Sequence, residues 1–200
     1  MCIRDRPDKG NKMNFQKLLF LFLLVLFFKL GNAFANHQGG PLYGVTIPVG
    51  FNATGENVKD PNSFSGYRIV ASPPLPFGIT YSNFVSTYDE TTNTHLKGTY
   101  THQILELILL RLPIGSWGFG LSLGGGNVTS SPENSNYVIE KTSSTSYSAN
   151  IASGAIGPFV LAASYQVIQA KKSNVQLSGT NVGSLDSSMA IQSLGLLFIF

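Results

Sequence analysis

Large apolar side chains alternate with very small or polar ones through much of this chain. Residues 117–124 read Trp-Gly-Phe-Gly-Leu-Ser-Leu-Gly, and residues 43–52 repeat the pattern with Gly, Thr, Pro and Asn as the second set. Because successive side chains of a strand point to opposite faces, each segment has an apolar face and a face of small residues. A soluble sandwich would place charged residues on its outer face, and these segments hold almost none. A narrow membrane barrel explains both faces, with small side chains in the lumen and large ones toward lipid.

The alternation predicts eight strands. They are expected at residues 43–53, 63–72, 77–88, 98–112, 116–127, 142–154, 158–170 and 188–200. Three connections are short, at 73–76, 113–115 and 155–157, and four are longer and polar, at 54–62, 89–97, 128–141 and 171–187. Short turns at one end and long loops at the other are typical of outer-membrane barrels. We therefore expect an all-β fold, an eight-stranded antiparallel up-and-down transmembrane β-barrel, preceded by a signal peptide helix.

The N-terminal segment has the features of an export signal. Lys12 and Lys17 precede an apolar run of eleven residues, 18–28, which is too short for a membrane-spanning helix. Ala33 and Ala35 then form an A-x-A cleavage site. We predict an artefact or extension at 1–12, a signal peptide at 13–35 and an outer-membrane barrel at 36–200; the alternative is an uncleaved anchor helix at 18–34.

Removal of this leader changes the charge of the protein. The whole chain has a net charge of +3, but residues 36–200 hold seven basic and eight acidic side chains. Its single cysteine, Cys2, also lies in the leader, so no disulfide is expected afterwards. The basic balance belongs to the leader, and no nucleic-acid partner is expected.

The chain closes with Ser193-Leu194-Gly195-Leu196-Leu197-Phe198-Ile199-Phe200. This octet resembles the C-terminal β-signal of bacterial outer-membrane barrels, with Ser193, Gly195, Phe198 and Phe200 at its four motif positions. The resemblance implies recognition by the barrel assembly machinery. Size and strand count are similar to the small eight-stranded family that includes OmpX-type, OmpW-type and lipid A-modifying barrels. The alternative is an edge strand of a periplasmic sandwich, which would leave an apolar edge prone to aggregation.

Three charged residues fall within predicted strands. Arg68 and Glu106 have the parity of the lumen face, and burial of each is costly unless they pair, so we predict an interior polar network around them. A role in ligand binding or permeation is the alternative. Arg111 has the lipid-facing parity unless a bulge shifts it. On the same strand, apolar residues share the parity of Glu106, which indicates either a bulge or an interior pocket for an apolar ligand. These residues are Ile104, Ile108, Leu110 and Leu112.

Nothing in the sequence specifies catalysis. The three histidines, His37, His95 and His102, are too dispersed for a zinc site, and His102 is expected to be an ordinary interfacial residue. We predict no catalytic residue, no cofactor and no metal site, although a Ser–His pair formed in space stays open.

The expected protein is therefore a monomeric, porin-like outer-membrane barrel of a Gram-negative bacterium. Its expected role is structural, in envelope integrity or in surface interaction. One alternative is a narrow channel or binding barrel for small apolar compounds, and a further one is a lipid A-modifying enzyme. Its expected partners are outer-membrane lipids, the barrel assembly machinery and a possible small apolar ligand.

Overall fold

The computed structural model describes residues 42–54, 63–73, 77–90, 96–114 and 116–199. The predicted extension at 1–12, the signal peptide at 13–35 with Ala33 and Ala35, and Phe200 of the C-terminal motif lie outside these residues. No helix long and apolar enough to cross a membrane occurs in the described ranges.

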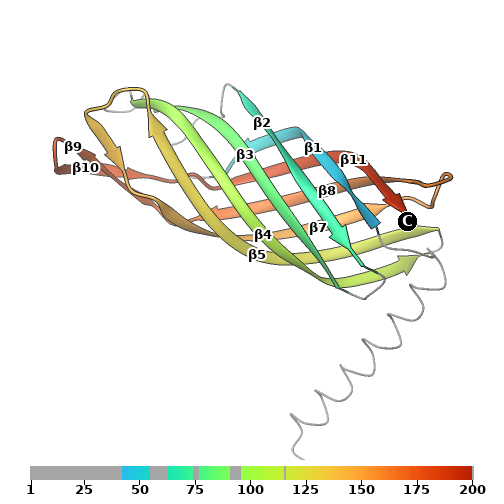
Figure 1. The fold of residues 1–200 in the computed structure, drawn as a ribbon. Helices are drawn as coiled ribbons and strands as arrows, with labels where there is room; N and C mark the ends of the chain where they lie inside the picture. The colour runs from blue at the N-terminus through green and yellow to red at the C-terminus, as the bar shows by residue number, and fades with distance from the viewer. Residues whose placement is uncertain (1–41, 55–62, 74–76, 91–95, 115, 200) are drawn as a thin grey trace, which may run out of the picture.

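Eight antiparallel strands form a closed barrel, which confirms the predicted fold class (Figure 1). Their order around the barrel is β1-β11-β8-β7-β5-β4-β3-β2, so that β1 pairs with both β2 and the last strand. The strands are β1 (Leu42–Ala53), β2 (Phe64–Ser72), β3 (Gly78–Glu90), β4 (Leu96–Ile114), β5 (Trp117–Pro132), β7 (Thr142–Ala152), β8 (Phe159–Ala170) and β11 (Met189–Ile199). Most of their ends lie within two residues of the predicted ones.

The two ends of the barrel differ. The end with the short connections β2–β3, β4–β5 and β7–β8, here called the turn end, also carries the end of β11 (Figure 1). At the opposite loop end, β6 (Tyr137–Ile139), β9 (Ser173–Leu177) and β10 (Thr180–Leu185) form a second sheet in the order β10-β9-β6. The prediction of polar loops at 128–141 and 171–187 was therefore wrong in part. β6 has only three residues, and β10 (Thr-Asn-Val-Gly-Ser-Leu) does not alternate between apolar and polar residues, so the pattern did not reveal them.

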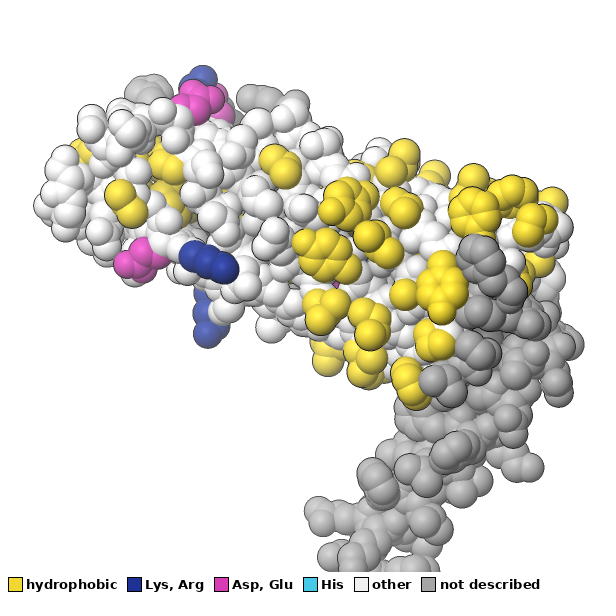
Figure 2. Space-filling model, in the orientation of Figure 1, with side chains coloured by type: hydrophobic (Ala, Val, Ile, Leu, Met, Phe, Trp, Pro, Cys, Tyr) yellow, Lys and Arg dark blue, Asp and Glu magenta, His cyan; other side chains and the backbone are white. Residues whose placement is uncertain are grey.

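The apolar side chains on the outside gather at the turn end. Figure 2 shows them over that half of the visible face, whereas the half that carries β9 and β10 is mostly polar. On β5 the exposed set is Trp117, Phe119, Leu121 and Leu123, and the outward residues beyond it include Asn127 and Thr129. Large apolar side chains exposed as a continuous belt are the lipid-facing surface of a transmembrane barrel.

The interior is packed in layers along the barrel axis. At the turn end Leu42, Val160 and Leu197 form an apolar cluster. Above the polar residues described below, a second cluster fills the middle of the lumen; it consists of Phe84, Ile104, Ile168, Met189 and Ile191. A third cluster joins the barrel to the loop-end sheet; it consists of Tyr88, Leu96, Tyr100, Val128, Ile139, Val175 and Leu185.

Candidate functional site

Arg68 and Glu106 meet inside the barrel. The two side chains are almost completely buried, and Nη2 of Arg68 lies 2.5 Å from Oε2 of Glu106. Arg68 comes from β2 and Glu106 from β4, and their inward direction follows from the alternation of outward Tyr67, Ile69 and Leu105 around them. The structure thus brings together the two charged residues that the sequence placed in the lumen.

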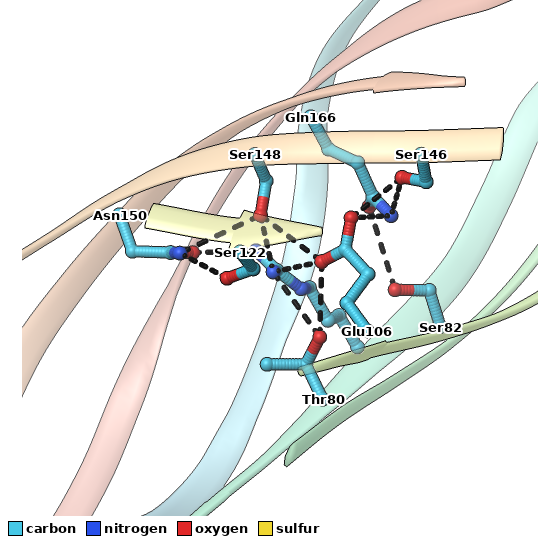
Figure 3. A network of polar contacts seen from close by, with 9 residues as sticks. Thr80, Ser82, Glu106, Ser122, Ser146, Ser148, Asn150 and Gln166 are labelled. Carbon is cyan, nitrogen blue, oxygen red and sulfur yellow. Dashed lines mark hydrogen bonds and ion pairs between the residues drawn. The ribbon is translucent and has the colours of Figure 1, made fainter. Parts of the chain in front are cut away.

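Every oxygen of the Glu106 carboxylate accepts hydrogen bonds (Figure 3). Ser146 Oγ and Gln166 Nε2 donate to Oε1, at 2.5 and 3.1 Å. Thr80 Oγ1 and Ser148 Oγ donate to Oε2, which also accepts from Arg68. This saturation compensates the desolvation of the charge, which an isolated buried carboxylate could not tolerate.

The guanidinium extends the network to further strands. Arg68 Nη1 donates to Asn150 Oδ1 at 2.7 Å, and Asn150 Nδ2 donates in turn to Ser122 Oγ at 2.8 Å. Together with Ser82, which contacts Gln166, these residues connect the six neighbouring strands β2, β3, β4, β5, β7 and β8. Among the described barrel strands, β1 and β11 are the two that add no hydrogen bond to this polar layer.

Sequence reasoning missed most partners in this layer. Thr80, Ser146, Ser148, Asn150 and Gln166 are small or neutral polar residues, and such residues are common throughout the chain. Their position in the alternation would have identified them. Each lies an even number of positions from another lumen-facing residue of its own strand, and such residues point to the same face.

A bulge in β4 decides the direction of Arg111. The pairing with β5 shifts between Ile108 and Leu110, so that Leu110 lies opposite Leu121 and Arg111 opposite Gly120. Since Leu121 faces outward, Leu110 does too, and Arg111 lines the lumen. The sequence left two explanations for the apolar residues with the parity of Glu106, a bulge or an interior apolar pocket. The bulge accounts for Leu110 and Leu112, whereas Ile104 and Ile108 are buried inside the barrel.

A cavity of about 50 Å³ lies between the polar layer and the turn end. Its lining runs from Arg68 and Thr80 to Leu42, Gly118 and Ala152 at the strand ends. Arg111 also lines it, in an otherwise mainly apolar wall.

The structure places His102 in the interior, not at the membrane interface. Its side chain is fully buried, opposite Phe84 on β3 and Val128 on β5, because it shares the parity of Ile104 and Glu106. Neither ring nitrogen forms a hydrogen bond with any described residue, so His102 has no serine partner there. The described residues also contain no group of three His, Cys, Asp or Glu suited to a metal ion.

The described residues of the C-terminal motif lie along the seam between β11 and β1. Ser193 is buried, Gly195 lies opposite Thr46, and Phe198 is exposed in the belt, where its ring packs 5.2 Å from that of Phe159. These positions describe a barrel-closing strand. Recognition by an assembly machinery stays a prediction.

Comparisons with known proteins bear on the fold. No protein-family model matches the sequence, and no curated protein matches it. Among solved structures, the chain is similar to the outer membrane protein AlkL determined by solid-state NMR in DMPC lipid bilayers. The match has a TM-score of 0.56 and 12% sequence identity, and covers 82% of this chain and 92% of AlkL. The chain therefore has the fold of the small eight-stranded outer-membrane β-barrels.

Proposed function

We propose that this protein is a sealed barrel of the bacterial outer membrane that holds a rigid β-structure above the lipid for a structural or surface-interaction role. In this proposal the apolar belt contacts lipid and the turn end faces the periplasm, as in barrels with short periplasmic turns. The loop end, with the sheet of β6, β9 and β10, then faces outward.

The observation that carries the proposal is the closed cross-section of the lumen. Arg68, Glu106 and their partners form a polar layer contributed by six of the eight barrel strands. Directly beyond it, Phe84, Ile104 and Ile191 are fully buried in the middle cluster. A solute that crosses the barrel axially would have to displace both a buried, hydrogen-bonded ion pair and a packed apolar layer, and well-packed interiors resist this.

The extent of the structure beyond the belt supports a role at the surface. β5 continues to Pro132, nine residues beyond Leu123, the last apolar residue of its outward face in the belt. Val175 and Leu185 of the loop-end sheet are buried against barrel residues such as Tyr100. This packing makes the sheet a continuation of the barrel wall.

Conductance and surface labelling test the proposal. Protein refolded in planar bilayers should show no discrete current steps, while a porin reconstituted in the same bilayers serves as the conducting control. Steps from the unaltered protein would overturn the sealed barrel and favour the narrow channel. For orientation, Val182→Cys on exposed β10 should react with a membrane-impermeant maleimide on intact cells. Reaction that requires permeabilised cells would contradict an outward loop end.

A further inference from the structure

The lysines of the described residues are unevenly distributed around the barrel. Three of the four, Lys141, Lys171 and Lys172, lie where β7 and β8 meet the loop-end sheet. Figure 2 shows dark blue side chains in the polar half, between the belt and the loop end. The fourth, Lys97 of β4, forms an ion pair with Asp89 of β3 at 2.9 Å. Most of the lysine charge is therefore concentrated beside β7 and β8.

Lys141 and Lys171 point outward from neighbouring strands. Lys141 directly precedes β7 and Lys171 directly follows β8, and both are exposed, in step with the exposed Ser143 and Gln169. The backbone N–H of Lys171 donates to the carbonyl oxygen of Ser143 at 3.0 Å, which places Lys171 opposite Ser143 and diagonal to Lys141. Diagonal residues on one face of an antiparallel pair lie about 7–8 Å apart. Two ammonium groups at such positions can contact one anion.

No carboxylate of the described residues neutralises these two ammonium groups. Neither Lys141 nor Lys171 forms an ion pair with a described residue. The acid next to Lys141 in the sequence is Glu140, whose carboxylate accepts hydrogen bonds from the side-chain amides of Asn174 and Gln176 on β9, at 3.0 and 3.2 Å. The two lysines are thus available for a negatively charged partner.

The outward residues change in a fixed order from the belt to the lysines. Each of the two lysines lies six residues beyond an exposed tyrosine, Tyr147 on β7 and Tyr165 on β8. At about 3.3 Å per residue and a strand tilt of about 40°, this separation is about 15 Å along the barrel axis. The exposed residues of β5, β7 and β8 at and below the lysines carry uncharged hydroxyl and amide groups: Asn127, Thr129, Ser143, Thr145 and Gln169.

This order matches the chemistry of a phosphorylated glycolipid. Its acyl chains would contact the apolar belt, and its sugar hydroxyls would exchange hydrogen bonds with the hydroxyl and amide side chains. Its phosphates would meet the lysines, which bind phosphate as point charges. A zwitterionic phospholipid has no sugar layer and carries its own cation beside the phosphate. The face therefore fits the anionic glycolipid better.

From these observations we propose that the outward face of β5, β7 and β8 binds a lipopolysaccharide of the outer leaflet, with one of its phosphate groups held between Lys141 and Lys171. The inference rests on the proposed outward loop end, because this lipid occupies the outer leaflet. It deepens the proposed surface role, since it names a lipid that would fix the barrel in that leaflet through a specific side.

NMR of lysines carrying ¹³C-methyl groups tests the site. Refolded, methylated protein is placed in phosphatidylcholine nanodiscs with increasing fractions of rough-type lipopolysaccharide, and Lys→Arg variants assign the signals. Those of Lys141 and Lys171 should shift saturably, whereas that of Lys97 should not. The same lipopolysaccharide dephosphorylated with hydrofluoric acid, and inorganic phosphate alone, should give no saturable shift. No saturable shift with the intact lipid, an equal shift at Lys97, or an equal shift with either control would overturn the proposal.

Single variants then measure the contribution of each lysine. In Lys141→Gln the signal of Lys171 is followed, and in Lys171→Gln that of Lys141. Each variant should need about fivefold more lipopolysaccharide for half-saturation, because each lysine near an anionic lipid surface adds a similar share of the attraction. Lys97→Gln is the matched control and should leave half-saturation unchanged. Folded, heat-modifiable variants with unaltered half-saturation would overturn the assignment to Lys141 and Lys171.

The orientation of the barrel is tested separately. Both leaflets of a nanodisc contain the lipopolysaccharide, so the NMR result does not depend on which end faces outward in cells. Absence of binding together with Val182→Cys labelling on intact cells would overturn the lipid site and leave the proposed surface role. Binding in nanodiscs with labelling confined to permeabilised cells would overturn the outward loop end, and with it lipopolysaccharide as the natural partner.

Discussion

Arg68 on β2 and Glu106 on β4 form an ion pair of 2.5 Å across the intervening strand β3. The pair does not belong to neighbouring strands, so it ties three strands together within the lumen. Thr80 of β3 lies between them and both accepts from Arg68 and donates to Glu106. The ion pair and the strand it crosses are thus one hydrogen-bonded unit.

Removal of Arg68 alone should therefore destabilise the barrel strongly. We expect Arg68→Met to lower the free energy of unfolding by about 3–5 kcal/mol, because the Glu106 carboxylate is then buried without a counter-charge. The double variant Arg68→Met with Glu106→Gln should recover part of this loss. Urea unfolding in phospholipid vesicles, followed by Trp117 fluorescence, measures the free energy of unfolding of both variants and of the single variant Glu106→Gln. Losses that add within about 0.5 kcal/mol would show that the two side chains do not interact.

Glycine is required where β4 and β5 approach each other closely. A Cβ at Gly126 would collide with the carbonyl oxygen of Gln103, and one at Gly124 with that of Leu105. We expect Gly126→Ala to cost about 1–3 kcal/mol, as overpacking does in other cores. The matched control is Gly183→Ala on β10, where a Cβ meets nothing within 4 Å, and its effect should stay within about 0.5 kcal/mol. Equal effects in urea unfolding would contradict the close approach as the cause.

The barrel and its central pair were predictable because alternation fixes both at once. A strand with outward Tyr67 and Ile69 must turn Arg68 inward, and the same parity holds for Glu106 between Leu105 and Leu107. The outward direction of the apolar residues determines which residues face the lumen. Eight alternating segments therefore predicted both the number of barrel strands and the charged residues of the lumen.

The bulge in β4 was not predictable in the same way. A single extra residue near Leu109 reverses the direction of all that follow, and the sequence of Arg111 and Leu112 reads equally well in either register. The partners of Glu106 were missed because Ser146 and Ser148 resemble many other serines until the register shows which lie at its level. The cavity depends on these same registers.

His102 should be more stable as an apolar residue. Its ring is fully buried, and neither nitrogen has a hydrogen-bond partner among the described residues. We expect His102→Leu to raise the free energy of unfolding by about 1–3 kcal/mol, because an unsatisfied buried polar group is removed. His102→Asn keeps a polar group at the same place and should give no gain. A loss with Leu and none with Asn would show that the imidazole is hydrogen-bonded in the membrane.

The loop-end sheet should open independently of the barrel when its buried contact is disturbed. Val175 of β9 is 3% exposed and packs in the cluster that includes Tyr88 and Leu96, whereas Val182 of β10 is 41% exposed. Val175→Asn removes an apolar contact and buries an amide, and we expect tryptic cleavage at exposed Lys171, next to β9, to accelerate about tenfold or more.

Val182→Asn makes the same chemical change on the open side of that sheet and should leave the cleavage rate unaltered. The folded gel mobility of the barrel should persist in both variants, because the ion pair and the middle cluster lie below the altered position. Loss of that mobility in Val175→Asn would show that sheet and barrel unfold as one unit. Equal cleavage of the two variants would contradict the packing of β9 on the barrel, on which the proposed rigid surface structure depends.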